Sequence, residues 1–166
     1  MNLDAIAVTH RVLLTDGCDG VGKSTLAAHL AARHGFAVVH SPQTPGSVDL
    51  VRRYRQLLAS PGRLVLDRCF VSELVYGPLY RGHSRLSWEQ AQCLAEQLAG
   101  SDGAFVHMTA WPDVIRARLL SRDGTAPPLA ALSVLVSAYQ RAFDALCPYA
   151  PVVTVDTSAG PLTPTG

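Results

Sequence analysis

Short apolar runs alternate along the chain with longer segments in which apolar residues recur at helical spacing. Their β-branched and aliphatic content predicts strands at residues 12–14, 36–40, 64–66, 104–109 and 152–155. The segments between them carry apolar faces that begin with pairs such as Leu26 and Leu30, and these faces predict helices. Strands that alternate with helices indicate a parallel sheet covered on both faces. The chain is therefore predicted to be a three-layer α/β domain.

Capping residues locate the ends of several predicted helices. Gly35 follows the first helix, Ser47 is expected to cap the second, and Pro112 suits the first turn of a later one. Ser87 and Gln90 have the spacing of a capping box. Helices are expected to begin at Ser47 and Ser87 and to cover residues 24–33, 72–80, 112–121 and 129–146. The helix at 72–80 is expected to stop or kink around Gly77-Pro78. The run at 36–40 is expected to be a buried strand.

Size and charge restrict the fold and function classes. The chain has 166 residues, 48% hydrophobic and 16% charged, which suits one domain, expected over residues 1–158. The Pro-, Gly- and Thr-rich end, 159–166, is predicted to be a disordered tail. A net charge of +1 argues against a nucleic-acid partner. Since no segment resembles a signal peptide or reaches membrane-spanning length, we expect a cytoplasmic protein without a membrane partner.

The four cysteines and six histidines show no spacing typical of a metal site. The cysteines lie far apart and are expected to be reduced thiols. Cys18 lies in a Gly-rich loop, where a thiol could be exposed, but a small filler residue is the reading we favour. The histidines are scattered, and none is assigned to catalysis.

The strand at 12–14 leads into a segment that fits the phosphate-binding P-loop pattern G-x-x-x-x-G-K-S. Backbone amides of such a loop surround phosphates, the lysine contacts the β- and γ-phosphates, and the serine hydroxyl holds Mg²⁺. The alternative, a Gly-rich turn that binds nothing, leaves the Lys-Ser pair unexplained. We therefore predict that ATP and Mg²⁺ bind at Gly17, Cys18, Asp19, Gly20, Val21, Gly22, Lys23, Ser24 and Thr25.

Asp67 and Arg68 directly follow the third predicted strand. In parallel sheets, ligands bind beyond the carboxyl ends of the strands, so these residues and segment 41–44 are expected near the P-loop. Asp67 is a candidate to orient Mg²⁺, with a helix cap as the alternative. Arg68 is a candidate to bind an anion, because a guanidinium grips phosphate bidentately. Asp19 is expected to bind a sugar hydroxyl, or else to stabilise the turn.

Further candidates come from the later helices. Arg118 and Arg122 lie four residues apart, on one helix face, before a loop rich in proline. Arginines on such a segment can stabilise the charge that develops in phosphoryl transfer, although an exposed basic helix end is the alternative. Aromatic residues near Arg81 could stack on a base, although core packing is the commoner role of such residues: these are Phe70, Tyr76 and Tyr80.

These motifs together resemble the thymidylate kinase family. The loop from Gly17 to Thr25, with Asp and Gly inside it, is similar to that family's P-loop. Asp67-Arg68 followed by Ser72 resembles its Asp-Arg segment. Residues 112–122 resemble the helix that leads into its LID arginines, and Tyr139 matches a tyrosine of its last helix. Deoxynucleoside monophosphate kinases of bacteriophages look closest, on the stretch DRCFVSELVYGPLYRG.

The resemblance implies a P-loop NTPase fold with the strand order 2-3-1-4-5 and a short LID. It implies transfer of the ATP γ-phosphate to a deoxynucleoside monophosphate, with dTMP the first candidate and a broader range open. Lys23 would hold the donor, Arg68 the acceptor phosphate and Asp19 the 3′-hydroxyl. Ser24, with Asp67 through water, would serve Mg²⁺. Catalysis would depend on Arg118 and Arg122, and the acceptor would contact Phe70, Tyr76, Arg81 and Tyr139.

One departure leaves alternatives open. The family's Thr-Arg-Glu-Pro segment is here His40-Ser41-Pro42-Gln43, so an acceptor-binding arginine is missing. Its role could fall to Arg52, Arg53 or Arg81. A nucleoside, antibiotic or metabolite kinase, or a P-loop switch module, is the alternative function. The oligomeric state is open, with a homodimer as one alternative.

Overall fold

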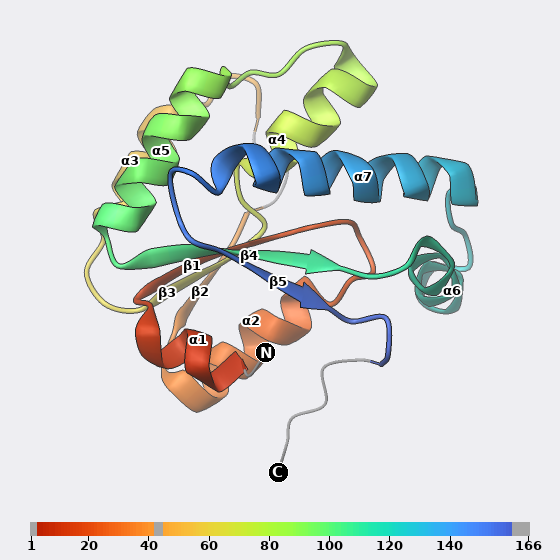
Figure 1. The fold of residues 1–166 in the computed structure, drawn as a ribbon, viewed down its shortest axis with the longest axis horizontal. Coiled ribbons are helices and arrows are strands. Elements are labelled where there is room, and N and C mark those ends of the chain that lie inside the picture. The colour runs from red at the N-terminus through yellow and green to blue at the C-terminus, as the bar shows by residue number, and fades with distance from the viewer. Residues whose placement is uncertain (1–2, 42–44, 161–166) are drawn as a thin grey trace.

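A five-stranded parallel sheet forms the centre of the computed structural model, which describes residues 3–41 and 45–160 (Figure 1). Its strands follow the order β2-β3-β1-β4-β5, and every neighbouring pair is parallel. This confirms the predicted fold class and strand order. The strands are β1 (Val12–Asp16), β2 (Ala37–His40), β3 (Leu64–Asp67), β4 (Gly103–Thr109) and β5 (Val152–Asp156).

Helices cover both faces of this sheet. In Figure 1, α1 (Leu3–Thr9) and α2 (Lys23–His34) lie on one side. The helices on the other side are α3 (Leu50–Leu58), α4 (Val71–Tyr76), α5 (Trp88–Gly100) and α7 (Leu129–Leu146). A π-helix, Gly77–Arg81, follows α4, and α6 (Pro112–Asp123) precedes α7. Among the described residues, no helix is long and apolar enough to span a membrane.

Burial is greatest at the central strands, where both faces are covered. Every residue of β1 and β3 is buried, as expected of a strand between helical layers. Edge-to-face aromatic contacts join Phe70, the residue before α4, to α3 and β4, and join β4 to α7. The ring centre of Phe70 lies 5.2 Å from that of Tyr54 and 5.7 Å from that of Phe105, which in turn lies 5.8 Å from that of Phe143. The site therefore rests on a packed core.

Several local predictions are confirmed. Gly35 ends α2 in the left-handed conformation (φ 67°), and Ser87 with Gln90 forms the capping box of α5. Pro112 occupies the first turn of α6. Residues 161–166, most of the predicted tail, lie outside the described residues.

Other predictions are wrong. Asp49, and not Ser47, caps α3 by accepting a hydrogen bond from the Arg52 amide at 3.1 Å. The strand at 36–40 lies at the sheet edge as β2, with Ala37 and His40 exposed, because no further strand covers it. The N-terminal helix α1 was not predicted. The interruption expected around Gly77-Pro78 is, by contrast, confirmed, because α4 ends at Tyr76 and the π-helix begins at Gly77.

His107 of β4 carries a testable consequence for stability. It is 1% exposed, stacks on Phe143 at 4.5 Å, and its Nδ1 has no hydrogen-bond partner among the described residues. Burial lowers the pKa of this imidazole to about 4, although Asp144 and Asp16 oppose the shift. The folded protein therefore keeps His107 neutral where the unfolded chain takes up a proton.

This difference should destabilise the protein as the pH falls from about 6.5 to about 4, by on the order of 3 kcal/mol in total. The measurement is urea unfolding at several pH values, comparing the natural protein with His107→Leu, which cannot titrate. We expect the natural protein to lose stability relative to His107→Leu as the pH falls through this range. Parallel curves between pH 6.5 and 4 would show that His107 is not held neutral.

Candidate active site

Two neighbouring cavities lie at the carboxyl ends of the strands. The first, of about 460 Å³, is called the P-loop cavity and is lined by residues 19–25 together with Arg68, Arg118, Arg122 and Thr157. The second, of about 410 Å³, is called the aromatic cavity; its lining includes Tyr54, Phe70, Tyr76 and the charged residues Asp19, Arg68, Glu73, Arg81 and Arg85. Asp19 and Arg68 line both cavities, so the two sites adjoin.

Lys23 begins α2 inside the P-loop and is 6% exposed. Its ammonium donates to the carbonyl oxygens of Gly17 and Cys18, each at 2.7 Å, and lies 3.7 Å from the Asp19 carboxylate. Burial lowers the pKa of Lys23, an effect that Asp16 and Asp19 oppose. The loop thus holds a cation in place beside an anion-binding helix N-terminus.

Cys18 of the same loop is buried, which agrees with the prediction that it is a small filler residue. Burial raises the pKa of its thiol to about 11.

Gly17 is the position where the loop has least room. A Cβ atom there would lie 2.0 Å from the backbone oxygen of Met108, at the end of β4. The loop passes this close to β4 because Gly17 has no side chain and adopts a positive φ of 149°.

Gly17→Ala should therefore displace the P-loop and destabilise the protein by more than the about 1–2 kcal/mol that unfavourable backbone alone costs. Gly35→Ala is the matched control, since Gly35 also has a positive φ but no atom within 4 Å of the added Cβ. Thermal unfolding and ATP titration calorimetry measure both effects. Equal losses of stability in the two variants, with ATP binding kept, would contradict the tight contact with Met108.

Ser24 and Asp67 meet at the base of the P-loop cavity. The Ser24 hydroxyl donates to Asp67 Oδ2 at 2.6 Å, and His40 Nδ1 lies 3.2 Å from the same oxygen. Asp67 is 7% exposed at the end of β3, while His40 comes from the edge strand β2. A hydroxyl beside a carboxylate offers the oxygen ligands that Mg²⁺ prefers, so these two residues fit the predicted metal.

Arg68 connects the two cavities. It has a positive φ of 76°, unusual for a residue with a side chain, and its amide donates to the Thr15 carbonyl at 3.1 Å. Its guanidinium pairs with the Asp19 carboxylate. Strained backbone of this kind persists where the surrounding structure requires it, and here it directs the side chain to the junction of both cavities.

Arg118 and Arg122 both line the P-loop cavity, but their surroundings differ. Arg118 donates to the Gly20 carbonyl at 3.3 Å and to Thr157, at 2.9 Å for the hydroxyl and 2.5 Å for the carbonyl. Arg122 is 62% exposed and pairs with Asp123, whose hydrogen bonds raise the pKa of the guanidinium. Arg118 is thus fixed against the loop, whereas Arg122 can reorient. Residues 124–128 connect α6 to α7, as expected of a short LID.

The aromatic cavity contains most of the predicted acceptor residues. Phe70 lines it but is 1% exposed, and Tyr76 stacks on Tyr80 with ring centres 5.6 Å apart. Arg81 also lines it and pairs with Glu73. Tyr139 lines neither cavity. Its hydroxyl donates to Asp16 at 3.2 Å, so the structure places it beneath the site.

Four residues of the site were not singled out from the sequence. Asp16, fully buried at the end of β1, accepts hydrogen bonds from the amides of Gly17 and Ser72 at 2.9 Å each and so ties the P-loop to α4. Its position, polar and directly after an apolar run, could have revealed it. The other three are Glu73, Arg85 and Thr157, which reach the site through tertiary packing and leave no local pattern.

Comparisons with known proteins establish the fold. The sequence matches no protein-family model and no curated protein. Among solved structures, the YorR protein from Bacillus subtilis, in complex with phosphorylated GDP, is similar with a TM-score of 0.77 and 20% identity, over 87% of this chain and 85% of that chain. The chain has the fold of the P-loop kinases.

Two further structures with the P-loop kinase fold are more distant. Deoxyadenosine kinase from M. mycoides with bound dCTP gives a TM-score of 0.58 at 12% identity, covering 87% of this chain and 89% of that chain. Shikimate kinase from Acinetobacter baumannii in complex with shikimate gives 0.53 at 17%, covering 96% and 89%. None of the three is named as a thymidylate kinase, so that closer resemblance stays a prediction.

Proposed function

We propose that this protein is a kinase that transfers the γ-phosphate of ATP to a deoxynucleoside 5′-monophosphate, with dTMP as the first candidate acceptor. The observation that carries this proposal is the junction of the two cavities at Arg68 and Asp19. A guanidinium at that junction can contact an acceptor phosphate while the P-loop holds the donor. Direct transfer needs donor and acceptor phosphates in adjoining sites.

The charge of the aromatic cavity favours an anionic acceptor. Three guanidiniums line it, from Arg68, Arg81 and Arg85, against the two carboxylates of Asp19 and Glu73. One net positive charge is left for a phosphate. Aromatic side chains in the same lining, of Tyr54 and others, offer a surface on which a base can pack.

In the proposed reaction, an oxygen of the acceptor phosphate attacks the γ-phosphorus of ATP. The bond from this phosphorus to the β–γ bridging oxygen breaks, ADP leaves, and the acceptor becomes a diphosphate. Lys23 and the P-loop amides hold the donor, and Arg118 and Arg122 offset charge on the transferred group. Mg²⁺, held by Ser24 and by Asp67 directly or through water, would neutralise phosphate charge.

The proposed Mg²⁺ role of Asp67 is tested by Asp67→Asn. The change removes the negative charge that faces Ser24, so we expect the Mg²⁺ concentration for half-maximal activity to rise by about 10–100-fold. Mg²⁺ titration of the rate at saturating ATP measures this. Asp156→Asn, an exposed carboxylate on β5 outside both cavities, is the matched control. An unchanged Mg²⁺ requirement in Asp67→Asn would exclude the carboxylate from this role.

A nucleoside or metabolite kinase is the second candidate. Two of the similar structures are named as deoxyadenosine kinase and shikimate kinase. Glu73 pairs with both Arg81 and Arg85, and Asp19 pairs with Arg68, so much of the positive charge is already compensated. An uncharged acceptor is compatible with such a cavity.

ADP release distinguishes the candidates. ATP with Mg²⁺ is incubated with each of the four deoxynucleoside monophosphates, with their nucleosides, with shikimate and gluconate, and with no acceptor. The proposal predicts stimulation by one or more monophosphates and none by nucleosides. Stimulation by nucleosides, shikimate or gluconate, and by no monophosphate, would establish the second candidate. ADP release at the same rate with every acceptor and without one would indicate a P-loop switch module and overturn both candidate functions.

A further inference from the structure

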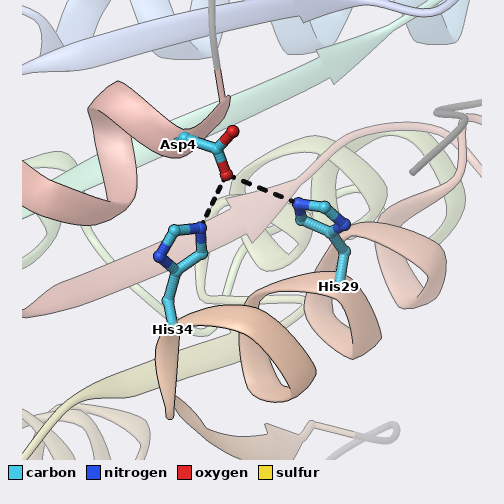
Figure 2. Close-up of side chains that lie close together, drawn as sticks. All are labelled: Asp4, His29 and His34. Carbon is cyan, nitrogen blue, oxygen red and sulfur yellow. Dashed lines mark hydrogen bonds and ion pairs between the residues drawn. The ribbon is translucent and has the colours of Figure 1, made fainter. Parts of the chain in front are cut away.

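Three ligand-type side chains meet away from both cavities, where α1 packs on α2. Figure 2 shows Asp4 of α1 between two imidazoles of α2, those of His29 and His34. Asp4 Oδ1 lies 2.7 Å from His34 Nε2 and 3.8 Å from His29 Nε2. His34 ends the helix that Lys23 begins, about 16 Å away along the axis at 1.5 Å per residue.

The spacing of these groups is close to that of a metal site. One ligand atom from each residue lies within 4.8 Å of the other two. Bonds of about 2.0–2.2 Å to Zn²⁺ in a tetrahedron place neighbouring ligand atoms about 3.3–3.5 Å apart. To reach this spacing, the Asp4 carboxylate has to move slightly away from His34 and towards His29. Rotation about side-chain bonds provides movements of this size.

A hydrogen bond explains only part of this arrangement. The hydrogen bond to Asp4 accounts for the position of His34 but not for that of His29, whose Nε2 faces the same oxygen beyond hydrogen-bond distance. Both imidazoles are largely buried, with side chains 14% and 17% exposed. Asp4 is 40% exposed, so solvent can reach the cluster and supply a further ligand.

We propose that Asp4, His29 and His34 form a binding site for a divalent transition metal, Zn²⁺ in the first instance, which links α1 to α2. Two imidazoles and one carboxylate, with a water in the fourth position, are a ligand set that Zn²⁺ commonly takes. Mg²⁺ prefers oxygen ligands and is not expected to compete.

The link would stabilise the N-terminal helix. α1 has seven residues, too few for a helix to persist alone, and it is held by packing of side chains such as Ile6 and Ala7, which are buried. Positive charge nearby will weaken metal binding: Arg33 interacts electrostatically with Asp4, and Arg63 donates to the His34 carbonyl at 3.0 Å.

The test is titration of the full chain with ZnCl₂, followed by calorimetry and by thermal unfolding in the absence of ATP. Cys93 and Cys147 are exposed thiols that could bind Zn²⁺, so all proteins carry Cys93→Ser and Cys147→Ser. We expect one site, and a melting temperature raised by about 5–10 °C at Zn²⁺ a hundredfold above its dissociation constant. Co²⁺ bound in its place should show the visible absorption of four-coordinate cobalt.

Three variants decide the outcome. His29→Asn and Asp4→Asn should each weaken Zn²⁺ binding by more than about 100-fold, the upper end of what the loss of an outer-sphere contact costs. His83→Ala, which removes an exposed histidine of the loop before α5, is the matched control and should bind as before. The His29 side chain makes no hydrogen bond to Asp4, which lies 3.8 Å away. The His29→Asn protein should therefore fold even if the Asp4→Asn protein does not. Zn²⁺ binding that is equally strong in His29→Asn, or absent in the parent protein, would overturn the proposal.

Discussion

Replacing Lys23 with alanine is expected to reduce phosphoryl transfer by at least about 10²–10³-fold, the usual cost of losing one preorganised electrostatic group. The Lys23 ammonium is the buried cation that the P-loop holds through the carbonyls of Gly17 and Cys18. Alanine leaves these carbonyls without their donor and the donor phosphates without their nearest positive charge. The measurement is ADP release at saturating ATP and acceptor, with circular dichroism to verify folding.

The composition of the chain offers a second, independent readout. Lys23 is its only lysine, so an acyl-phosphate analogue of ATP that acylates amines can label one side chain. We expect mass spectrometry to find the label on Lys23 and ATP to protect against it. Arg141→Ala, an exposed arginine of α7 outside both cavities, should retain full activity and labelling. Normal activity of Lys23→Ala, or labelling that ATP does not prevent, would exclude the P-loop as the donor site.

Replacing Arg68 with alanine is expected to act mainly on the acceptor. Arg68 lines both cavities, and a charge-assisted contact to phosphate is worth about 1.5–3 kcal/mol, which corresponds to about a 10–150-fold rise in acceptor KM. The KM for ATP should change much less, because the P-loop amides and Lys23 remain. Initial rates over a matrix of ATP and acceptor concentrations separate the two effects.

The Arg68 prediction has a graded control. Arg68→Lys keeps the positive charge but loses the bidentate geometry, so its acceptor KM should lie between those of the natural protein and of Arg68→Ala. Asp19→Asn removes the carboxylate that pairs with Arg68 and tests whether this ion pair positions the guanidinium. An unchanged acceptor KM in Arg68→Ala would remove this residue from the acceptor site.

Much of the fold could be predicted because local patterns carry it. The apolar runs determine which segments become strands, and end signals such as Gly35 and Pro112 locate helix boundaries through backbone sterics. Asp49 was missed as a cap because Ser47, two residues earlier, is an equally good capping residue. The exposure of β2 depends on its place at the sheet edge, which periodicity does not encode.

Some residues of the site could likewise be predicted from local patterns, and others could not. The P-loop is one continuous segment, and Asp67 and Arg68 are neighbours in the sequence, so residue types and spacing suffice to predict them. Glu73 and Arg85 enter the aromatic cavity from separate segments, and only packing brings them together. The cluster of Asp4, His29 and His34 was likewise missed, because its carboxylate comes from a helix that the sequence pattern did not predict.

The fate of a radiolabelled γ-phosphate tests most directly the claim that the two cavities hold donor and acceptor. The protein is mixed with labelled ATP, Mg²⁺ and dTMP or another stimulating monophosphate, and the products are separated chromatographically. The account predicts label in the β-phosphate of the deoxynucleoside diphosphate, in equal amount to the ADP formed. Label found only in inorganic phosphate, at the same rate with and without acceptor, would contradict it.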